Sequence, residues 1–347
     1  MKVVARMELT SGQVLGQDVI ANGEVVYKAD TVLDEFMIQR LKRYSVMTVT
    51  VKEPVDFATT RYEKLRYDEQ FKNFEKAYNK ELFFFKKKMS QFIHNGEKLE
   101  ETELLTIYYN LAAYLPTPTK LLDYLYTMLP NEDELTYNQL LSSALFAGML
   151  ADWLGMNEES RKTLILCGFY YDVGKISLPY QILWKPDKLT QEEFEQIKTH
   201  PVTGYEMIKN LNIRQEVKNC VLMHHEKLDG SGYPYHLDKS SIDKYTRYIT
   251  IVDTYIAMAS PRSYRKALHP LQIVEVFERD MHKYDAELLL PIMKRIADAQ
   301  IGNTITLSDD TQWEIFVLHP SRLSRPLLRN KQNEILDLVE HPELTIK

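Results

Sequence analysis

The sequence is poor in glycine and cysteine, with 12 Gly and 2 Cys among 347 residues. The scarcity of glycine, together with 22 Tyr and 13 Phe, favours helices over a glycine-rich dinucleotide-binding fold or an all-β protein. Cys167 and Cys220 both lie in apolar stretches and form no metal-type pair. We therefore expect two buried thiols in a reducing compartment.

A surplus of positive charge and a long apolar run are also missing. Lys and Arg total 43 against 49 Asp and Glu, a net charge of −6, whereas a protein that binds duplex nucleic acid usually has a basic surplus. No stretch reaches the roughly 18–20 apolar residues that a membrane span needs. The nearest, residues 140–154, carries Ser142, Ser143 and Asp152. Because the amino terminus is also charged too early for a signal peptide, we expect a cytoplasmic protein with no membrane span.

The chain divides into four regions, and we predict a mainly α protein with β structure near both ends. The regions are a small β-rich accessory domain at 1–52, a linker with long aromatic helices at 53–130, a helical bundle at 131–300 and a β-containing tail at 301–347. In the first region, β-prone runs flank a turn at 21–23 and precede a helix at 34–43. In the last, two strands are predicted at 305–307 and 313–318.

Residues 60–93 have the pattern of one long helix with an aromatic stripe. Apolar residues recur at steps of three and four: Phe71, Phe74, Tyr78, Leu82, Phe85, Met89 and Phe92. This spacing is nearly a heptad repeat, which is typical of a helical dimer seam. The alternative, which we favour, is a helix that packs on its own domain. A homodimer through residues 71–92 therefore stays an open prediction.

Histidines and acidic residues that could hold a metal recur in the bundle region. His200 lies in a predicted helix at 191–211, His224 and His225 end the next helix, and Asp172 and Asp253 lie in apolar segments. Taken singly, each such residue is more often structural. Together, imidazoles and carboxylates on several helices of one bundle indicate a core metal site. Paired metals of this kind serve phosphoester hydrolysis, because they activate water and neutralise phosphate.

The residues around these candidates resemble the signature segments of the HD-GYP family over residues 135–300. The matching segments are Tyr171-Asp172-Val173-Gly174-Lys175, His200-Pro201 with Gly204, His224-His225-Glu226, the loop Asp229-Gly230-Ser231-Gly232-Tyr233-Pro234, and Asp253 with Ser260, Arg262 and Arg265. The resemblance implies an HD-type helical bundle, two or three iron or manganese ions, and hydrolysis of cyclic di-GMP to pGpG and on to GMP. It also implies that Asp172, His200, His224 and His225 hold one ion.

Two positions depart from the family pattern. Gln139 and Tyr171 stand where the family has metal-binding histidines, which leaves only Asp172 and Asp253 for the other ion. An amide is a poor metal ligand, and a phenol binds iron only once it is deprotonated. We therefore expect one well-held divalent ion, iron or manganese, with zinc, nickel or magnesium as alternatives, and a degraded second site.

Four basic residues match family positions that face the phosphates, namely Lys175, Lys185, Arg262 and Arg265. Arginine suits phosphate because it donates in pairs, although each of these residues could instead be a surface charge. The loop with Asp229, Gly230, Gly232, Tyr233 and Pro234 also has two interpretations. It either borders the active site and carries contacts to a signalling partner, as in the family, or only turns the chain.

Three functions remain open from the sequence. The first is a signalling protein that recognises cyclic di-GMP through a partly degraded metal centre, with weak or absent hydrolysis. The second is an active cyclic di-GMP phosphodiesterase. The third is a scaffold for dimerisation or partner binding. The four ligands that remain at one site weigh against the scaffold.

Overall fold

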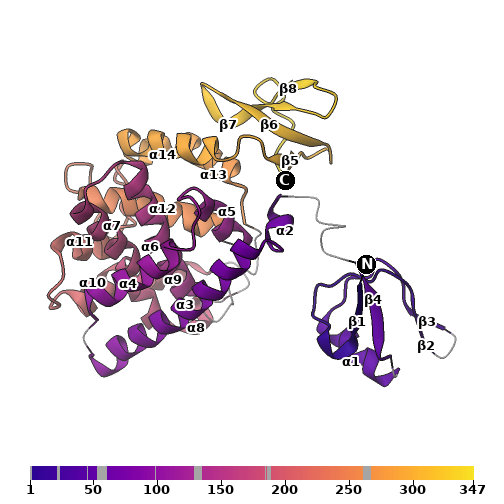
Figure 1. The fold of residues 1–347 in the computed structure, drawn as a ribbon. Coiled ribbons are helices and arrows are strands. Elements are labelled where there is room, and N and C mark those ends of the chain that lie inside the picture. The colour runs from indigo at the N-terminus through magenta and orange to yellow at the C-terminus, as the bar shows by residue number, and fades with distance from the viewer. Residues whose placement is uncertain are drawn as a thin grey trace. The chain divides into compact units, whose positions relative to one another are not determined.

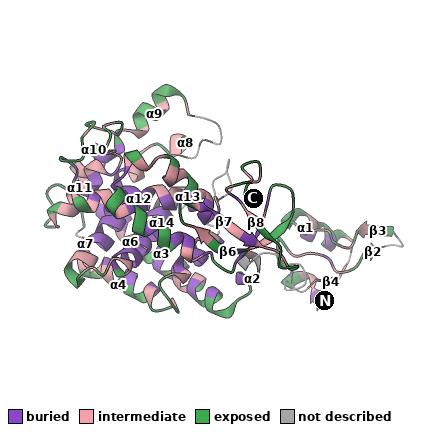
Figure 2. Ribbon diagram, turned by 90° about the horizontal axis from the view of Figure 1, so that it is seen from above, coloured by how far each residue is buried: buried purple, intermediate pink, exposed green. Residues whose placement is uncertain are grey.

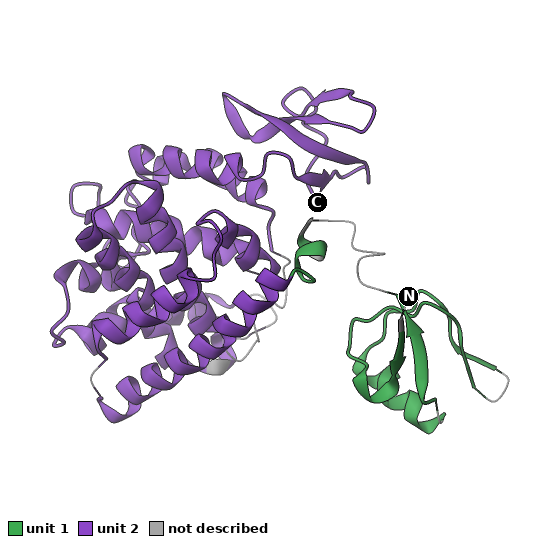
Figure 3. Ribbon diagram, in the orientation of Figure 1, with its two compact units in different colours: residues 1–68 green, residues 69–347 purple. Residues whose placement is uncertain are grey.

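The computed structural model forms two compact units, residues 1–68 and 69–347 (Figure 3). It describes residues 2–21, 24–44, 46–52, 61–97, 99–128, 135–183, 185, 189–260 and 267–347. Each unit is presented by itself below.

The first unit contains two small antiparallel sheets and short helices (Figure 1). Its elements are β1 (Lys2–Ala5), η1 (Arg6–Glu8), β2 (Val19–Ala21), β3 (Glu24–Tyr27), α1 (Glu35–Arg43), β4 (Thr48–Val51) and α2 (Arg61–Leu65). β1 pairs with β4, and β2 pairs with β3. Asp34 caps α1 by accepting from the Met37 amide at 2.7 Å, so that Ile38 and Leu41 enter the unit's core. The predicted turn falls largely on residues 22 and 23, outside the described residues.

The second unit is a helical bundle. Its helices are α3 (Glu69–Asn95), α4 (Glu101–Ala112), α5 (Lys120–Thr127), α6 (Leu135–Trp153), α7 (Glu158–Tyr170), η4 (Val173–Ser177), α8 (Tyr180–Leu183), α9 (Gln191–Ile197), α10 (His200–Ile208), α11 (Gln215–Met223), α12 (Lys244–Ala259), α13 (Pro270–Arg279), η5 (Met281–Lys283) and α14 (Ala286–Asp298). α6 is buried all round from residue 138 to 151, as expected of a helix at the centre of a bundle. Figure 2 shows the buried residues gathered along α6 and α12.

The aromatic stripe of α3 is buried inside its own unit. Phe74 packs against Tyr124 of α5 with ring centroids 5.0 Å apart, and Phe85 packs against Phe169 of α7 at 5.2 Å. The hydroxyl of Tyr78 hydrogen-bonds Ser142 of α6 at 2.9 Å. The stripe is therefore part of the core of its own unit, and a homodimer through residues 71–92 stays a prediction. The predicted helix at 60–93 is also divided, with a break at 66–68.

The carboxyl-terminal segment forms a four-stranded antiparallel sheet, where the sequence predicts only two strands. Its strands, in spatial order, are β5 (Thr304–Thr306), β6 (Gln312–His319), β7 (Arg322–Arg329) and β8 (Ile335–Asp337). Ile315 and Leu328 share a core with Leu271 of α13 and Ala297 of α14, so this sheet packs on the bundle. The mainly helical architecture with β pieces near both ends is confirmed. Among the described helices, none is both long and apolar enough to span a bilayer.

Candidate metal centre

Three junctions between helices bring the candidate ligands together. Asp172 follows α7 at the start of η4, His200 opens α10, and His224 and His225 follow α11. Gly174 lets η4 lie directly against α10, because a Cβ at this position would be 2.0 Å from the carbonyl oxygen of His200. The ligand atoms of the four residues lie within 4.8 Å of one another.

Backbone carbonyls orient two of the imidazoles. Nδ1 of His200 lies 2.6 Å from the oxygen of Ile197, and Nδ1 of His224 lies 3.1 Å from the oxygen of Val221. A carbonyl oxygen can only accept, so each Nδ1 carries a proton, which leaves Nε2 without one in a neutral ring. The two Nε2 atoms face each other at 3.1 Å. Two lone pairs at this distance repel unless a cation lies between or beside them.

The remaining ligand atoms at this point also lack a donor. Oδ1 of Asp172 lies 3.1 Å from Nε2 of His200 and 3.7 Å from Nε2 of His224. This Oδ1 and Nε2 of His225 are buried without a hydrogen-bond partner. Such orphaned atoms are costly to bury, and a metal ion would satisfy all of them at once. Two or three imidazoles with one carboxylate suit iron, manganese or zinc, so the residues fit a bound divalent ion.

The charge states also suit a metal. Burial lowers the pKa of His224 to about 3, and burial with the neighbouring imidazoles lowers the pKa of His225 well below its usual value, so both rings are neutral at pH 7. Burial alone would raise the pKa of Asp172, but the ammonium of Lys175 beside its carboxylate lowers that pKa. Neutral imidazoles and an ionised carboxylate are the forms that bind metals.

Asp253 lies beside this cluster in a different environment. Its Oδ1 accepts from Nε2 of Gln139 at 3.0 Å and from the Tyr171 hydroxyl at 3.2 Å. Its Oδ2 is 3.8 Å from Nδ1 of His225. Burial raises the pKa of Tyr171 well above that of a free phenol, helped by the nearby carboxylates of Asp253 and Asp172, so the side chain is a neutral donor and not a tyrosinate ligand.

The predicted phosphate-binding residues have different surroundings. Nζ of Lys175 is 2.6 Å from Oδ2 of Asp172. Lys185 pairs with both carboxylate oxygens of Glu193, at 2.7 and 2.8 Å. Arg262 and Arg265 lie outside the described residues.

The predicted motif loop folds back onto His225, one of the predicted ligands. The Tyr233 ring stacks on that imidazole with centroids 4.6 Å apart, and its backbone amide donates to the His225 carbonyl at 3.3 Å. Gly232 permits this approach, since a Cβ there would be 2.4 Å from the Cα of Glu226. Asp229 accepts from the Ser231 amide, Gly230 has a positive φ of 74°, and the bond before Pro234 is cis.

Glu226 is a functional residue to which the sequence motif assigned no role. Its carboxylate is buried and accepts from the backbone amides of Tyr235 at 2.7 Å and Leu237 at 3.0 Å. Because Glu226 directly follows His225, these two hydrogen bonds hold the far end of the loop close to His225. The signal was an acidic residue directly after two histidines and ahead of a glycine-containing turn.

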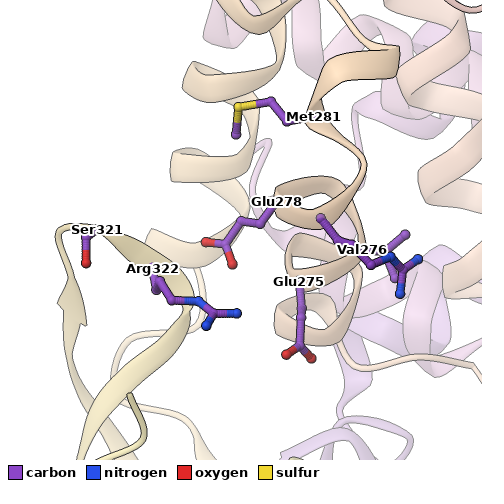
Figure 4. A pocket seen from close by; sticks show the side chains of 7 residues that line it. Glu275, Val276, Glu278, Met281, Ser321 and Arg322 are labelled. Atoms are coloured by element: carbon purple, nitrogen blue, oxygen red, sulfur yellow. The ribbon is translucent and has the colours of Figure 1, made fainter. Parts of the chain in front are cut away.

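A pocket lies between α13, η5 and the β6–β7 turn. This pocket of about 540 Å³ is lined by Glu275, Glu278, Arg279, Ser321 and Arg322 among others (Figure 4). Charges of both signs line it, and Glu278 is already bonded to Ser324. Within the described part of the chain, the Asp172 cluster is the group with metal-binding geometry.

Comparison with known proteins agrees with this geometry. Residues 123–288 match the family model described as HD domain, so the helical bundle is HD-like. The chain is 37% identical over 123 residues to the cyclic di-GMP phosphodiesterase response regulator RpfG of Xanthomonas campestris, covering 35% of this chain and 32% of that protein. It is 28% identical over 204 residues to a cyclic di-GMP phosphodiesterase of Pseudomonas aeruginosa, covering 58% and 49%.

A third relative differs in its named substrate. This is the 3'3'-cGAMP-specific phosphodiesterase 1 of Vibrio cholerae, 31% identical over 150 residues, which cover 43% of this chain and 35% of that protein. The aligned segments thus span 32% to 49% of the length of these relatives.

Proposed function

We propose that the protein is a metal-dependent phosphodiesterase of the HD-GYP type that acts on cyclic di-GMP. One observation carries the proposal: two unprotonated imidazole nitrogens converge on an unpartnered carboxylate oxygen in a buried site. The names of the relatives support the choice of a cyclic dinucleotide as substrate. The products would be pGpG and, after a second cleavage, GMP.

The ligands of the proposed ion are Asp172, His200, His224 and His225. A bound divalent ion, iron or manganese, supplies a Lewis acid for the phosphate and lowers the pKa of its water. The chain's own contribution is orientation: the Ile197 and Val221 carbonyls fix the two rings, and Tyr233 covers the face of His225.

Basic residues would bind the phosphates of the substrate. Lys175 lies at the cluster and can donate to a phosphate oxygen while it neutralises Asp172. We also assign Lys185, Arg262 and Arg265 to this role on the resemblance alone. The 1–52 region would then be an accessory module that receives a signal or a protein partner.

Product formation tests the proposal. The purified protein, loaded anaerobically with Fe²⁺ or Mn²⁺, should convert cyclic di-GMP to pGpG, and a parallel reaction with 3'3'-cGAMP tests substrate class. His224→Ala should abolish both the bound metal and the product. His94→Ala is the matched control, since His94 is exposed on α3 and remote from the ligands in sequence. A folded, metal-loaded protein that yields no product contradicts the proposal.

A second function is favoured by the surroundings of Asp253. Gln139 and Tyr171 donate to this carboxylate where the family has two metal-binding histidines. A receptor for cyclic di-GMP with weak or absent hydrolysis would need only the remaining ion and the basic residues. Calorimetric heat on addition of cyclic di-GMP, with no product, supports the receptor. If the protein gives neither calorimetric heat nor product, a scaffold for dimerisation or partner binding is the function that remains.

A further inference from the structure

We propose that the outer face of helix α3 binds an anionic membrane surface. Two exposed phenylalanines would enter the headgroup region, while a row of lysines contacts the lipid phosphates. The outer face consists of Lys72, Lys76, Lys80, Phe83, Phe84 and Lys87. It takes no part in the metal centre, so a membrane contact would be a property of the chain beyond the proposed hydrolysis.

The residues of the outer face lie on one side of the helix. They follow one another at steps of three and four positions, which return to the same side because an α-helix turns once in 3.6 residues. All of them are exposed. The aromatic stripe of α3 lies on the opposite side and is buried in the bundle. The helix therefore has one side that packs and another that faces solvent.

Two large apolar side chains on this solvent side are left in water. Phe83 is 65% exposed and Phe84 is 45% exposed. Their rings meet edge to face with centroids 6.0 Å apart, and Nζ of Lys80 lies 5.9 Å from the centroid of Phe84. A single exposed apolar residue is common on protein surfaces, but an adjacent aromatic pair among lysines is typical of a helix that lies in a membrane interface.

The lysines of the outer face carry charge that the protein does not neutralise. Among the described side chains, Lys76, Lys80 and Lys87 have no acidic partner. Lys72 reaches Glu69 only at 3.8 Å, on the exposed surface. The chain as a whole has a net charge of −6, so this basic face contrasts with the rest of the molecule. Its charge is complementary to an anionic surface.

The remaining acidic residues of α3 do not lie on the outer face. Glu81 is buried and accepts from the amide of Asn110 of α4 at 3.0 Å. Glu75 is half-buried, one position after the core residue Phe74. The positive charge of the outer face is therefore not cancelled by acids of its own helix.

The type of basic residue and the shape of the face favour a lipid surface over a protein partner. α3 contains six lysines and no arginine. Arginine is the cation enriched at protein interfaces, whereas lysine is a compact point charge that suits attraction to many headgroups at once. The row from Lys72 to Lys87 extends about 22 Å along a convex helix surface. Lipid headgroups can adapt to such a surface without a matching groove.

A second copy of the chain is a poor partner for the same face. Pairing two outer faces would place the lysines of one copy against those of the other, and like charges brought together across an interface are unfavourable. The same row is attracted to lipid phosphates.

Vesicle co-sedimentation of the full chain tests the proposal without reference to catalysis. Vesicles of phosphatidylglycerol and phosphatidylcholine in equal amounts provide the anionic surface, and vesicles of phosphatidylcholine alone provide the neutral one. We expect the wild type to sediment with the anionic vesicles only. Binding should decrease when NaCl is raised from about 0.05 to about 0.5 M, because salt screens the lysines. No binding, or equal binding to both kinds of vesicle, overturns the proposal.

Two sets of substitutions separate the rings from the charges. Phe83→Ser/Phe84→Ser removes the apolar contact. Lys76→Gln/Lys80→Gln/Lys87→Gln removes three charges. Each set should weaken binding to the anionic vesicles by about tenfold or more, while circular dichroism and Mn²⁺ content stay as in the wild type. Wild-type affinity in either set overturns the proposal.

Each set has a matched control. Phe316→Ser/Val317→Ser also replaces two adjacent apolar residues, which are 39% and 46% exposed on β6. Lys28→Gln/Lys244→Gln/Lys331→Gln removes three exposed lysines outside α3. Both controls should bind like the wild type. If they lose as much affinity as the outer-face variants, the binding is not specific to α3 and the proposal is overturned.

A dye at position 83 gives a direct readout that does not depend on the serine variants folding. Cys167 and Cys220 are buried, so the exposed thiol of Phe83→Cys should react first with an environment-sensitive maleimide. Its emission should shift to the blue with anionic vesicles, and that of Phe316→Cys should not. No shift at position 83 overturns the proposal. A dimer that does not bind vesicles and dissociates in Phe83→Ser would assign the face to a second copy instead.

Discussion

Two polar clusters lie side by side in the bundle and differ in the balance of donors and acceptors. Around Asp172, lone pairs of His200 and His224 converge and a buried oxygen has no donor. Around Asp253, the amide of Gln139 and the hydroxyl of Tyr171 supply donors for the carboxylate. Both clusters are buried, so burial does not distinguish them. A surplus of unprotonated acceptors indicates a metal site, whereas matched donors indicate a structural hydrogen-bond network.

The largest expected effect comes from exchanging the two carboxylates for amides one at a time. Asp172→Asn removes an anionic ligand of the proposed ion, and because such a contact is worth several kcal/mol we expect Mn²⁺ affinity to fall by about two orders of magnitude or more. Asp253→Asn should leave the Mn²⁺ affinity within about tenfold of the wild-type value. Calorimetric titration with Mn²⁺ measures both, and equal losses would erase the distinction between the clusters.

A smaller effect is expected at His269, a buried histidine whose hydrogen bond to the backbone indicates a structural role. Its Nδ1 accepts from the Leu271 amide at 3.2 Å and caps α13. Burial lowers its pKa from 6.5 to about 4, so the unfolded chain binds the proton first as the pH falls. The free energy of unfolding should therefore drop as the pH falls from 6.5 to about 4, by on the order of 3 kcal/mol from this group.

Urea unfolding at several pH values measures this effect. In His269→Gln, the loss of stability between these pH values should be smaller than in the wild type by that amount. Added Mn²⁺ should leave the difference unchanged, since His269 is not among the proposed ligands. If the difference in stability between His269→Gln and the wild type disappears when Mn²⁺ is added, His269 belongs to the metal centre.

The smallest effect is expected for Tyr171→Phe. The variant keeps the ring but removes the hydroxyl that donates to Asp253 at 3.2 Å, and losing a hydrogen bond to a buried charged group costs about 1–3 kcal/mol. Urea unfolding of the metal-free protein should show this loss. Mn²⁺ content should not change. A variant that loses metal but not stability would show that Tyr171 serves the ion.

The sequence predicted most of the helices because their apolar periodicity is regular. The stripe of α3 is an example, whereas α6 is recognised by its long and mostly apolar run. The prediction of a single helix at 191–211 was wrong, because the segment forms two helices, α9 and α10, with the second beginning at His200-Pro201. Proline lacks the backbone amide that would continue the hydrogen bonds of the first helix. Strands β7 and β8 were missed, since their pairing depends on residues distant in the chain and Pro326 interrupts the β pattern of β7.

For the site, local motifs pointed to the residues but not to their partners. The spacing identified Asp172 and His200 as candidates, and the structure brings them together. It could not reveal that Lys175 pairs with Asp172, since that contact depends on the 3₁₀ turn, or that Glu226 binds two backbone amides across the loop. Such contacts depend on three-dimensional closure, which residue types and spacing do not encode.

The loop after His225 is closed into a ring. It starts at this ligand, returns to it through the Tyr233 amide and ring, and is bound at its far end by Glu226. Exposed members such as Ser231 and Tyr235 lie on the outside of this ring. Their side chains can therefore change during evolution, altering what the rim of the site recognises, while the imidazole beneath keeps its position. The ring separates the part of the loop that can diversify from the part that must stay fixed.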